Sequence, residues 1–433
     1  MYLSSCIPVD SRVHLSSGIE LFWGRQSSRF PRQAKDMKLT SCFSNCFSSA
    51  SETAIDRGGP GKMLGVFISF FFLLSAYTEA EEENDQNFTV FSYSELKAAT
   101  HGFSASNKIG EGAFGSVYKG LLRNGIVVAV KMLSVELESM RGEREFVSEI
   151  ITLSNLKHEN LVTLKGCCVD GANRFLVYNY MENNSLAQIL LGGEQNRIKL
   201  GWEPRRAISL GVARGLAYLH EEAKPHIVHR DIKASNILLD QNLIPKVSDF
   251  GLSRILRDNV THISTHVAGT LGYLAPEYAI SGRLTRKTDV YSFGVLLLEI
   301  ISGQTVVNYD LEHGERYLVQ KVMLLEAWEL YRANSILQLV DPIVGMNYPE
   351  EEAVRFIKVG LLCAQETAKL RPEMSRAVRM LTNDIDIEGV QISQPGLVSD
   401  LMNIKLGQKT TFPSISSKAS SMESSRSPPS SYS

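Results

Sequence analysis

The sequence has few cysteines and almost no net charge. Its six cysteines, at positions 6, 42, 46, 167, 168 and 363, include no C-x-x-C pair. This pattern excludes a disulfide framework and a zinc site of the usual spacing, and it suits a reducing compartment. A formal net charge of −2 gives no cationic excess, so we expect no nucleic-acid partner. The 433 residues exceed one typical domain, which predicts two cores or one bilobal unit with flanking segments.

Long apolar runs are also scarce, because only residues 63–77, MLGVFISFFFLLSAY, form one. The run falls short of the roughly 20 residues usual for a membrane helix. Arg57 and Lys62 precede it and acidic residues follow it, which opposes an orientation with the C-terminal bulk in the cytoplasm. The sequence is compatible with two alternatives for this run: a membrane span inserted against the charge bias, or an apolar stretch that is not inserted into a membrane. Cys42 and Cys46 beside it are candidate acylation sites.

The two ends of the chain lack a core-forming pattern. Residues 1–62 are rich in Ser and Gly, residues 382–433 are rich in Ser and Pro, and both are predicted to be disordered. Residues 78–108 form a juxta-domain segment before a globular region that we place at 109–381.

The globular region changes its periodicity along the chain. Strand patterns dominate residues 105–180, apart from a helical stretch near 143–156. Helical patterns dominate residues 203–221 and most of 287–381. The fold class is therefore predicted as α+β, with a small β-rich lobe followed by a large helical lobe.

A glycine-rich stretch, KIGEGAFGSVYKG at 108–120, has two interpretations. Gly110, Gly112 and Gly115 form the G-x-G-x-x-G spacing of both a dinucleotide-binding turn and a hairpin that covers ATP phosphates. Apolar, β-branched runs follow, and Asn124-Gly125 between them supplies the positive φ angles of a tight two-residue turn. No helix is predicted at the third glycine, which favours the hairpin.

Two short motifs in the second half of the globular region contain several polar residues with side-chain oxygens, together with a lysine. IVHRDIKASNILLD, 227–240, carries Asp231, Lys233 and Asn236, and VSDFGLS, 247–253, adds Asp249. Carboxylate and amide oxygens are the hard ligands that Mg²⁺ prefers. Lys131 ends the strand pattern VAVK, where a solvent-facing lysine is the alternative. Together with the glycine loop, and in this order, these pieces predict a site for metal-bound ATP.

These motifs resemble those of the eukaryotic protein kinases over about 109–381. FSYSELKAATHGFS, HENLVTLKGCC and VAGTLGYLAPEY are similar to the plant receptor-like kinases, relatives of Pelle and the interleukin-1-receptor-associated kinases. The resemblance implies the bilobal kinase fold, with an N-lobe at 109–178, a hinge at 179–181 and a C-lobe at 182–381. It implies a receptor-like cytoplasmic serine/threonine kinase.

The resemblance also implies ATP and Mg²⁺, or Mn²⁺, as cofactors, and a role for each matching residue. The implied ATP-binding residues are Ile109, Gly110, Gly112, Gly115, Val117, Ala129, Lys131, Glu149, Tyr178, Tyr180 and Met181. The implied catalytic residues are Asp231 and Lys233, the metal ligands Asn236 and Asp249, and the structural residues Glu277, Asp289 and Arg371. Glu145, one helical turn before Glu149, is the alternative partner for Lys131.

The implied reaction is transfer of the γ-phosphate of ATP to Ser or Thr hydroxyls of proteins in receptor-linked signalling. Lys233 and Thr270 fit the serine/threonine class. A pseudokinase scaffold is the competing class, but no residue needed for transfer is missing. We expect protein substrates, an upstream receptor kinase, transient self-association, and a cytoplasmic kinase domain that joins the plasma membrane only if 63–77 or an acyl chain anchors it.

Regulation by phosphorylation is a further expectation. Arg230 directly precedes Asp231. An arginine at this position is expected to pair with a phosphate on the activation loop, which runs from Asp249 to Glu277. The acceptor candidates in the loop are Thr261, Ser264, Thr265 and Thr270, with Ser264 or Thr265 preferred.

Overall fold

The computed structural model describes residues 88–112, 115–133, 141–154, 156–192, 200–257, 260–306, 308–309, 316–317 and 320–397. The predictions for residues 1–62 and 63–77 lie outside these residues. Within them, no helix is long and apolar enough to cross a membrane.

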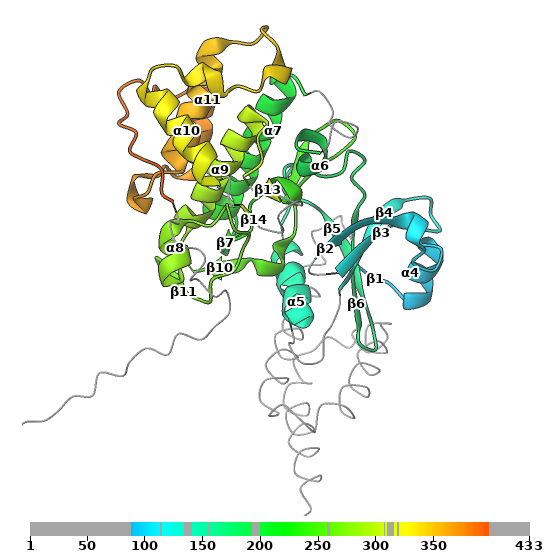
Figure 1. The fold of residues 1–433 in the computed structure, drawn as a ribbon. Coiled ribbons are helices and arrows are strands. Elements are labelled where there is room, and N and C mark those ends of the chain that lie inside the picture. Colours follow the sequence, from blue (N-terminus) through cyan, green and yellow to red (C-terminus); the bar gives the residue numbers. More distant parts are fainter. Residues whose placement is uncertain are drawn as a thin grey trace, which may run out of the picture.

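A six-stranded sheet forms the smaller lobe (Figure 1). Its strands are β1 (Thr89–Val90), β2 (Lys108–Gly112), β3 (Gly115–Leu121), β4 (Val127–Leu133), β5 (Leu164–Asp170) and β6 (Asn173–Asn179). The strand order is β1-β5-β6-β4-β3-β2, and every pairing is antiparallel except that of β1 with β5. Side chains alternate along β4, so Val128 and Val130 are buried on one face while Lys131 lies on the other.

The β3–β4 hairpin forms as predicted, but its turn is of a different type. Leu122 and Ile126 close the turn, since Leu122 N donates to Ile126 O at 2.9 Å, which leaves a three-residue loop. Gly125 has φ 80°, whereas Asn124 does not have a positive φ. A three-residue hairpin loop needs only one left-handed residue, so the prediction of a two-residue turn was wrong.

Helix α5 (Arg141–Leu153) is the helix predicted near 143–156. Its apolar residues Phe146, Ile150 and Leu153 recur at helical spacing and are buried. This face packs on the sheet and on the larger lobe, within one continuous core. The position of α5 between the lobes is visible in Figure 1.

Residues 88–108 cover the outer face of the small lobe. Helix α4 (Tyr93–Ala99) starts at Ser92, whose side chain accepts a hydrogen bond from Glu95 N at 3.2 Å. The short η2 (Ala105–Asn107) follows. Phe103 stacks on Phe175 of the sheet with 5.3 Å between ring centroids. The folded lobe therefore begins before residue 109, within the segment that the sequence suggested lay ahead of the domain.

The larger lobe is helical (Figure 1). Its helices are α6 (Leu186–Leu190), α7 (Trp202–Ala217), the π-helical η3 (Tyr218–Glu222), α8 (Pro276–Ser281), α9 (Arg286–Ser302), α10 (Gln320–Arg332), α11 (Glu350–Cys363) and α12 (Met374–Leu381). Short 3-10 turns connect them at η6 (Ile336–Leu339), η7 (Pro342–Val344) and η8 (Ala368–Leu370). Helix α9 is buried from Thr288 to Ser302, which makes it the centre of this lobe.

The large lobe also contains four two-stranded sheets and two further short turns among its described residues. The pairs are β7 (His226–Val228) with β10 (Arg254–Leu256), β8 (Ile237–Leu239) with β9 (Pro245–Val247), β11 (Ile263–Ser264) with β12 (Arg283–Leu284), and β13 (Asn308–Tyr309) with β14 (Arg316–Tyr317). The turns η4 (Ala234–Asn236) and η5 (Phe250–Leu252) carry the polar motifs.

Residues 382–397 pack on the large lobe, which corrects the prediction that disorder begins at 382. Ile387 and Ile392 are buried. Tyr291 of α9 donates its hydroxyl to Gly396 O at 2.5 Å, and Ser393 donates to Gln365 Oε1 at 2.7 Å. Apolar residues at irregular spacing produce no periodic pattern, so the sequence did not predict this packing.

Candidate active site

Lys131 lies between two carboxylates from different lobes. Its Nζ forms an ion pair with Glu149 Oε1 of α5 and a second ion pair with Asp249 Oδ1 at 2.9 Å. Asp249 directly precedes η5 in the large lobe. The lysine is therefore paired with Glu149 rather than with the alternative Glu145, and its side chain is 13% exposed rather than facing solvent.

The strands explain why Lys131 faces this way. It lies opposite Val117 of β3 and next to Leu176 of β6 in the register of the sheet. Tyr178 of β6 donates its hydroxyl to Glu149 Oε2. Glu149 thus receives one hydrogen bond on each oxygen, which holds α5 against the sheet.

The charges of this cluster stabilise one another. Burial acts to lower the pKa of Lys131, but Asp249 and Glu149 reverse this, and the pKa lies above its usual value. Burial acts to raise the pKa of Asp249, yet the adjacent Lys131 ammonium holds it below the usual range. Lysine and aspartate are therefore both charged at neutral pH, although both are largely buried.

Three polar side chains, those of Lys233, Asn236 and Thr270, contact the carboxylate of Asp231. Lys233 Nζ lies 2.8 Å from Asp231 Oδ2, and Asn236 Nδ2 donates to the same oxygen at 3.1 Å. Thr270, which the sequence suggested as an acceptor site and as a mark of serine/threonine specificity, donates its hydroxyl to Asp231 Oδ1 at 2.6 Å. Lys233 also donates to Thr270 Oγ1 at 2.7 Å. The structure thus brings Thr270 into contact with Asp231.

Asp289 at the start of α9 fixes the backbone of this loop. Its carboxylate accepts hydrogen bonds from His229 N at 2.7 Å and from Arg230 N at 2.8 Å, and it also contacts His220 Nε2. Arg230 has φ 74°, a strained conformation for a non-glycine residue. The two backbone bonds to a fully buried carboxylate hold the loop in this conformation.

A second buried ion pair braces the large lobe. Arg371 donates to both oxygens of Glu277, at 2.8 and 2.9 Å, in a bidentate arrangement. Its remaining donors bond to backbone carbonyls, including Gln365 O at 2.7 Å.

The glycine loop forms part of the same small-lobe sheet. Gly110 and Gly112 belong to β2, Gly112 pairs with Gly115, and residues 113–114 lie outside the described part. Gly115 has φ 132°, and an added Cβ would lie 1.9 Å from Met132 O. Only glycine fits there, so the third glycine is required by the hairpin itself.

Two oxygen donors are available for a divalent cation. The side-chain amide nitrogen of Asn236 donates to Asp231, and none of the hydrogen bonds that Asn236 makes with described residues uses its side-chain Oδ1. Asp249 carries a charge. A carboxylate and an amide oxygen suit a hard cation such as Mg²⁺. In the described part of the chain, no cluster of three or more His, Cys, Asp or Glu side chains is suited to a metal. Water and phosphate oxygens would have to complete the coordination.

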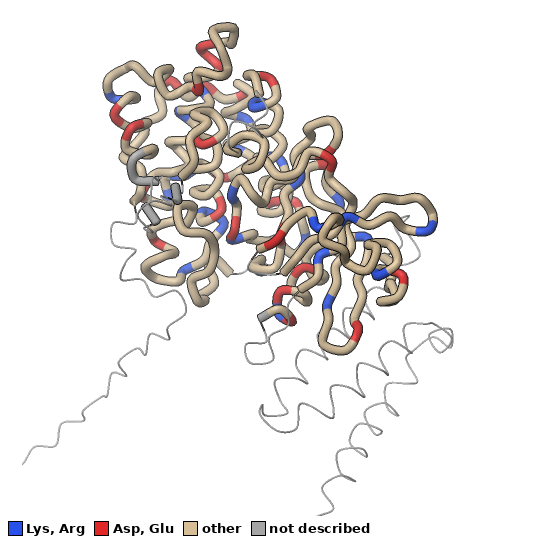
Figure 2. The backbone as a smooth tube through the Cα atoms, turned by 45° about the vertical axis from the view of Figure 1, so that its right-hand side comes forward, with Lys and Arg blue, Asp and Glu red and all other residues tan. Residues whose placement is uncertain are grey.

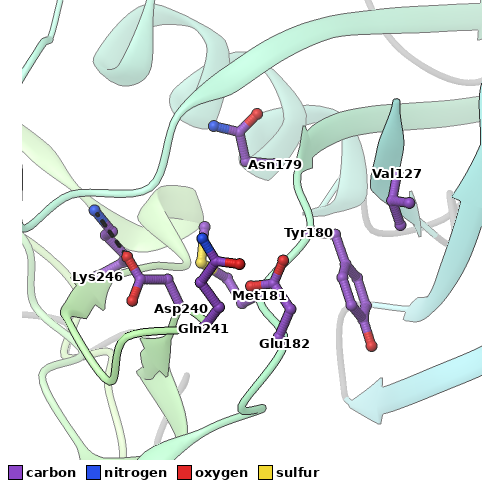
Figure 3. A pocket seen from close by; sticks show the side chains of 8 residues that line it. All are labelled: Val127, Asn179, Tyr180, Met181, Glu182, Asp240, Gln241 and Lys246. Atoms are coloured by element: carbon purple, nitrogen blue, oxygen red, sulfur yellow. Dashed lines mark ion pairs between the residues drawn. The ribbon is translucent and has the colours of Figure 1, made fainter. Parts of the chain in front are cut away.

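The hinge contributes a separate pocket of about 270 Å³ on its outer side. Figure 3 shows Tyr180, Met181 and Glu182 on the hinge side, with Lys246 directed toward Asp240 across from them. None of the charged residues around Lys131 or Asp231 lines this pocket. Lys119 Nζ lies 4.5 Å from the centre of the Tyr180 ring, which turns this side chain toward β3.

Arg230, directly before Asp231, has an incompletely paired guanidinium that contacts the segment carrying the preferred acceptor sites. Arg230 Nη2 donates to His266 O at 3.1 Å and to Tyr278 Oη at 2.8 Å. Its Nε and Nη1 are buried and have no hydrogen-bond partner among the described residues. Ser264 on β11 is exposed and Thr265 is half-buried; Thr265 directly precedes His266, and Ser264 lies two residues before it.

Two polar contacts at this site had no clear sequence signal. Tyr273 donates to the buried Glu299 of α9 at 2.6 Å, and Ser253 after η5 bonds to Thr152 of α5 at 2.8 Å. Serines, threonines and tyrosines occur throughout the sequence, so their pairing across more than 20 residues could not be identified from spacing.

A lysine held between carboxylates of two lobes, together with an aspartate bonded to a lysine and an asparagine, is the arrangement of a phosphotransferase. The model of the protein kinase domain matches residues 103–380, and the chain belongs to the protein kinase family. Such domains use ATP and a divalent metal and act on protein substrates.

The relatives narrow the class to serine/threonine-protein kinases. Cold-responsive protein kinase 1 of Arabidopsis thaliana is 52% identical over 351 residues, which are 78% of this chain and 88% of that protein. A probable LRR receptor-like serine/threonine-protein kinase of the same plant is 52% identical over 326 residues, 75% of this chain. A probable leucine-rich repeat receptor-like serine/threonine-protein kinase, also from Arabidopsis, is 49% identical over 297 residues, 69% of this chain. The matches cover 30% and 28% of these two longer relatives.

Proposed function

We propose that the residues around Lys131 and Asp231 bind ATP with Mg²⁺, and that Asp231 directs a Ser or Thr hydroxyl of a protein substrate at the γ-phosphate. The observation that carries this proposal is the pairing of Lys131 with both Glu149 and Asp249. It supports the proposal because the small-lobe Lys131 and the large-lobe Asp249 lie close enough to bind the same ligand.

Each charged group has a distinct part in this proposal. Lys131 contacts the α- and β-phosphates, while Glu149 orients its ammonium. Asn236 and Asp249 supply the oxygens that hold the metal, which neutralises charge on the phosphoryl group when bound. Lys233 stabilises the same developing charge from the loop.

The contacts of Asp231 support its role toward an alcohol. An O–H group, that of Thr270, already donates to Asp231 Oδ1 at 2.6 Å, and a substrate hydroxyl needs the same acceptor. Lys233 and Asn236 hold the other oxygen, so the carboxylate keeps a fixed orientation.

Phosphotransfer from Mg-ATP to myelin basic protein tests these roles. Asp231→Asn keeps the size of the side chain and removes the acceptor charge, so we expect kcat to fall by about 100-fold or more. Asp170→Asn, at an exposed position in the β5–β6 hairpin, is the matched control and should retain activity. Equal rates for Asp231→Asn and wild type would overturn the catalytic assignment.

We also propose that phosphorylation of Ser264 or Thr265 by another copy of the chain raises the activity. The Nε and Nη1 nitrogens of Arg230, which have no hydrogen-bond partner among the described residues, support this, because a buried guanidinium gains from the oxygens of a phosphate. Mass spectrometry after incubation with Mg-ATP should find phosphate at one of these residues. Protein treated with phosphatase should have a lower turnover number than the phosphorylated protein. Unchanged turnover of the Ser264→Ala/Thr265→Ala variant would contradict the proposal.

The names of the receptor-like relatives support a place in receptor-linked signalling, with an upstream receptor kinase as partner. We propose that the kinase domain works in the cytoplasm, where ATP is available. Fractionation of a tagged chain with and without residues 63–77 tests whether this run carries it to membranes. Equal distribution of both forms would exclude an anchor at 63–77.

A further inference from the structure

Three hydroxyl groups join α5 to the turn that follows Asp249. Thr152 Oγ1 lies 2.8 Å from Ser253 Oγ, and Ser253 Oγ donates to Phe250 O at 2.7 Å. A serine hydroxyl has one proton, so Thr152 must be the donor in its bond to Ser253. Ser148 Oγ is placed to donate to Phe250 O at 3.2 Å or to Ser253 O at 3.3 Å.

In this hydroxyl bridge, made of Ser148, Thr152 and Ser253, the last two residues are buried and Ser148 is half-buried. Ser253 is 3% and Thr152 5% exposed. The backbone of η5 also lies close to α5, because a Cβ added to Gly251 would be 3.3 Å from the Glu145 side chain. A buried hydroxyl that loses its partner is costly, so separation of the two elements is opposed at this contact.

The bridge lies beside the charged cluster described above. Ser148 directly precedes Glu149, and Thr152 follows it by three residues on the same helix. Ser253 ends the turn that Asp249 begins. The hydroxyls therefore connect the two elements whose carboxylates hold Lys131, and a shift of α5 away from η5 would break the bridge together with the Lys131 ion pairs.

We propose that Ser148, Thr152 and Ser253 are positioning residues, which keep Glu149 and Asp249 at the distance that Lys131 and a metal-bound ATP require. This inference rests on the proposed roles of Lys131, Glu149 and Asp249. The bridge acts through the carboxylates and not by touching ATP.

A pair of substitutions at Thr152 separates a hydroxyl effect from a packing effect. Thr152→Val keeps the shape of the side chain and removes the hydroxyl, whereas Thr152→Ser keeps the hydroxyl and removes a methyl group. Thr152→Val should lower kcat/KM for ATP by about three- to tenfold, the value of one hydrogen bond. Thr152→Ser should stay near wild type. If Thr152→Ser is the more damaged variant, the side chain acts by packing and the inference is wrong.

Ser253→Ala gives an independent variant, because it removes the shared partner of the bridge. The double variant Thr152→Val/Ser253→Ala should be no less active than Ser253→Ala, since the two residues share one bond. Additive losses would contradict a shared bridge.

Two control variants measure ordinary loss of a buried hydroxyl. Ser209→Ala removes a buried hydroxyl that donates to Arg205 O at 2.8 Å in α7. Thr100→Val removes one that donates to Leu96 O at 2.8 Å at the end of α4. Both should lower the melting temperature and leave kcat/KM for ATP unchanged. A similar fall of kcat/KM in these controls would show that the effect is general destabilisation and would overturn the inference.

Asp249→Asn, assayed in parallel, separates failure of the bridge from failure of the proposed function. If Asp249→Asn is inactive while Thr152→Val and Ser253→Ala match wild type, only the positioning inference fails. If Asp249→Asn keeps full activity, the proposed metal-binding role fails, and the positioning inference falls with it.

Discussion

The burial of Glu299 should make the stability of the folded protein depend measurably on pH. This carboxyl group of α9 is fully buried and receives hydrogen bonds from Tyr273 Oη at 2.6 Å and Val306 N at 3.1 Å. Burial raises its pKa to about 7, from a usual value of 4.5, and the two hydrogen bonds offset only part of this. The folded protein therefore holds a proton on Glu299 that the unfolded chain has lost at the same pH.

The sign and size of the effect follow from this difference. Below pH 4.5 both states are protonated and Glu299 costs nothing, whereas above pH 7 the folded state must bury a charge. Stability is lost as pH rises between these values, because the folded state binds more protons than the unfolded state. Between pH 5 and pH 8 the loss is about 2.5 kcal/mol, since one pKa unit corresponds to about 1.4 kcal/mol.

Glu299→Gln isolates this contribution from the other titrating groups. The amide keeps an acceptor for Val306 N and can donate to the Tyr273 oxygen, but it has no charge to bury. The melting temperature of the variant minus that of wild type should rise by about 5 °C or more between pH 5 and pH 8. A difference that stays constant over this range would refute the reasoning.

Three further predictions concern stability and nucleotide binding. Asp341→Asn should lower the free energy of unfolding by about 3 kcal/mol or more in urea titrations, because it removes the negative charge that faces the buried guanidinium of Arg205, whose Nη2 lies 2.6 Å from Asp341 Oδ2; an unchanged midpoint would count against it. Tyr178→Phe removes the hydroxyl that bonds to Glu149, so the KM for ATP should rise by about threefold or more, and an equal KM would show that Tyr178 does not help hold α5. Removal of residues 382–397 together with all that follow them should lower the melting temperature by several degrees, since it exposes the surface that they cover; a transition at the wild-type temperature would refute this.

The sequence was most informative where one residue type at one spacing has a single chemical use. The α+β class with two lobes is confirmed, because strand and helix periodicities are properties of local sequence. The ion pair of Lys131 with Glu149, rather than Glu145, needed three-dimensional placement, since both carboxylates lie on α5. Motif spacing alone favoured Glu149 but gave no distance.

The sequence was least informative where contacts join distant, common residues. Arg205 and Asp341 are 136 residues apart, and nothing in either local pattern marks a buried pair. The packing of residues 382–397 uses apolar residues at irregular spacing, among them the buried Ile387 and Ile392, within a C-terminal stretch that is Ser/Pro-rich as a whole. Figure 2 adds that acidic and basic residues are interspersed over both lobes, so charge patterning could not single out the cleft. Such features are set by tertiary packing, which a single sequence does not encode at short range.

Affinity for ATP with and without Mg²⁺ tests the central claim most directly, which is that Lys131, Asn236 and Asp249 serve one metal-bound nucleotide. Titration calorimetry of the full chain should show tighter binding of ATP with Mg²⁺ than with EDTA. Asp249→Asn should weaken the Mg²⁺-dependent part by about tenfold or more, since even the loss of groups that merely support metal ligands has that effect. Identical Mg²⁺ dependence in wild type and Asp249→Asn would contradict the account.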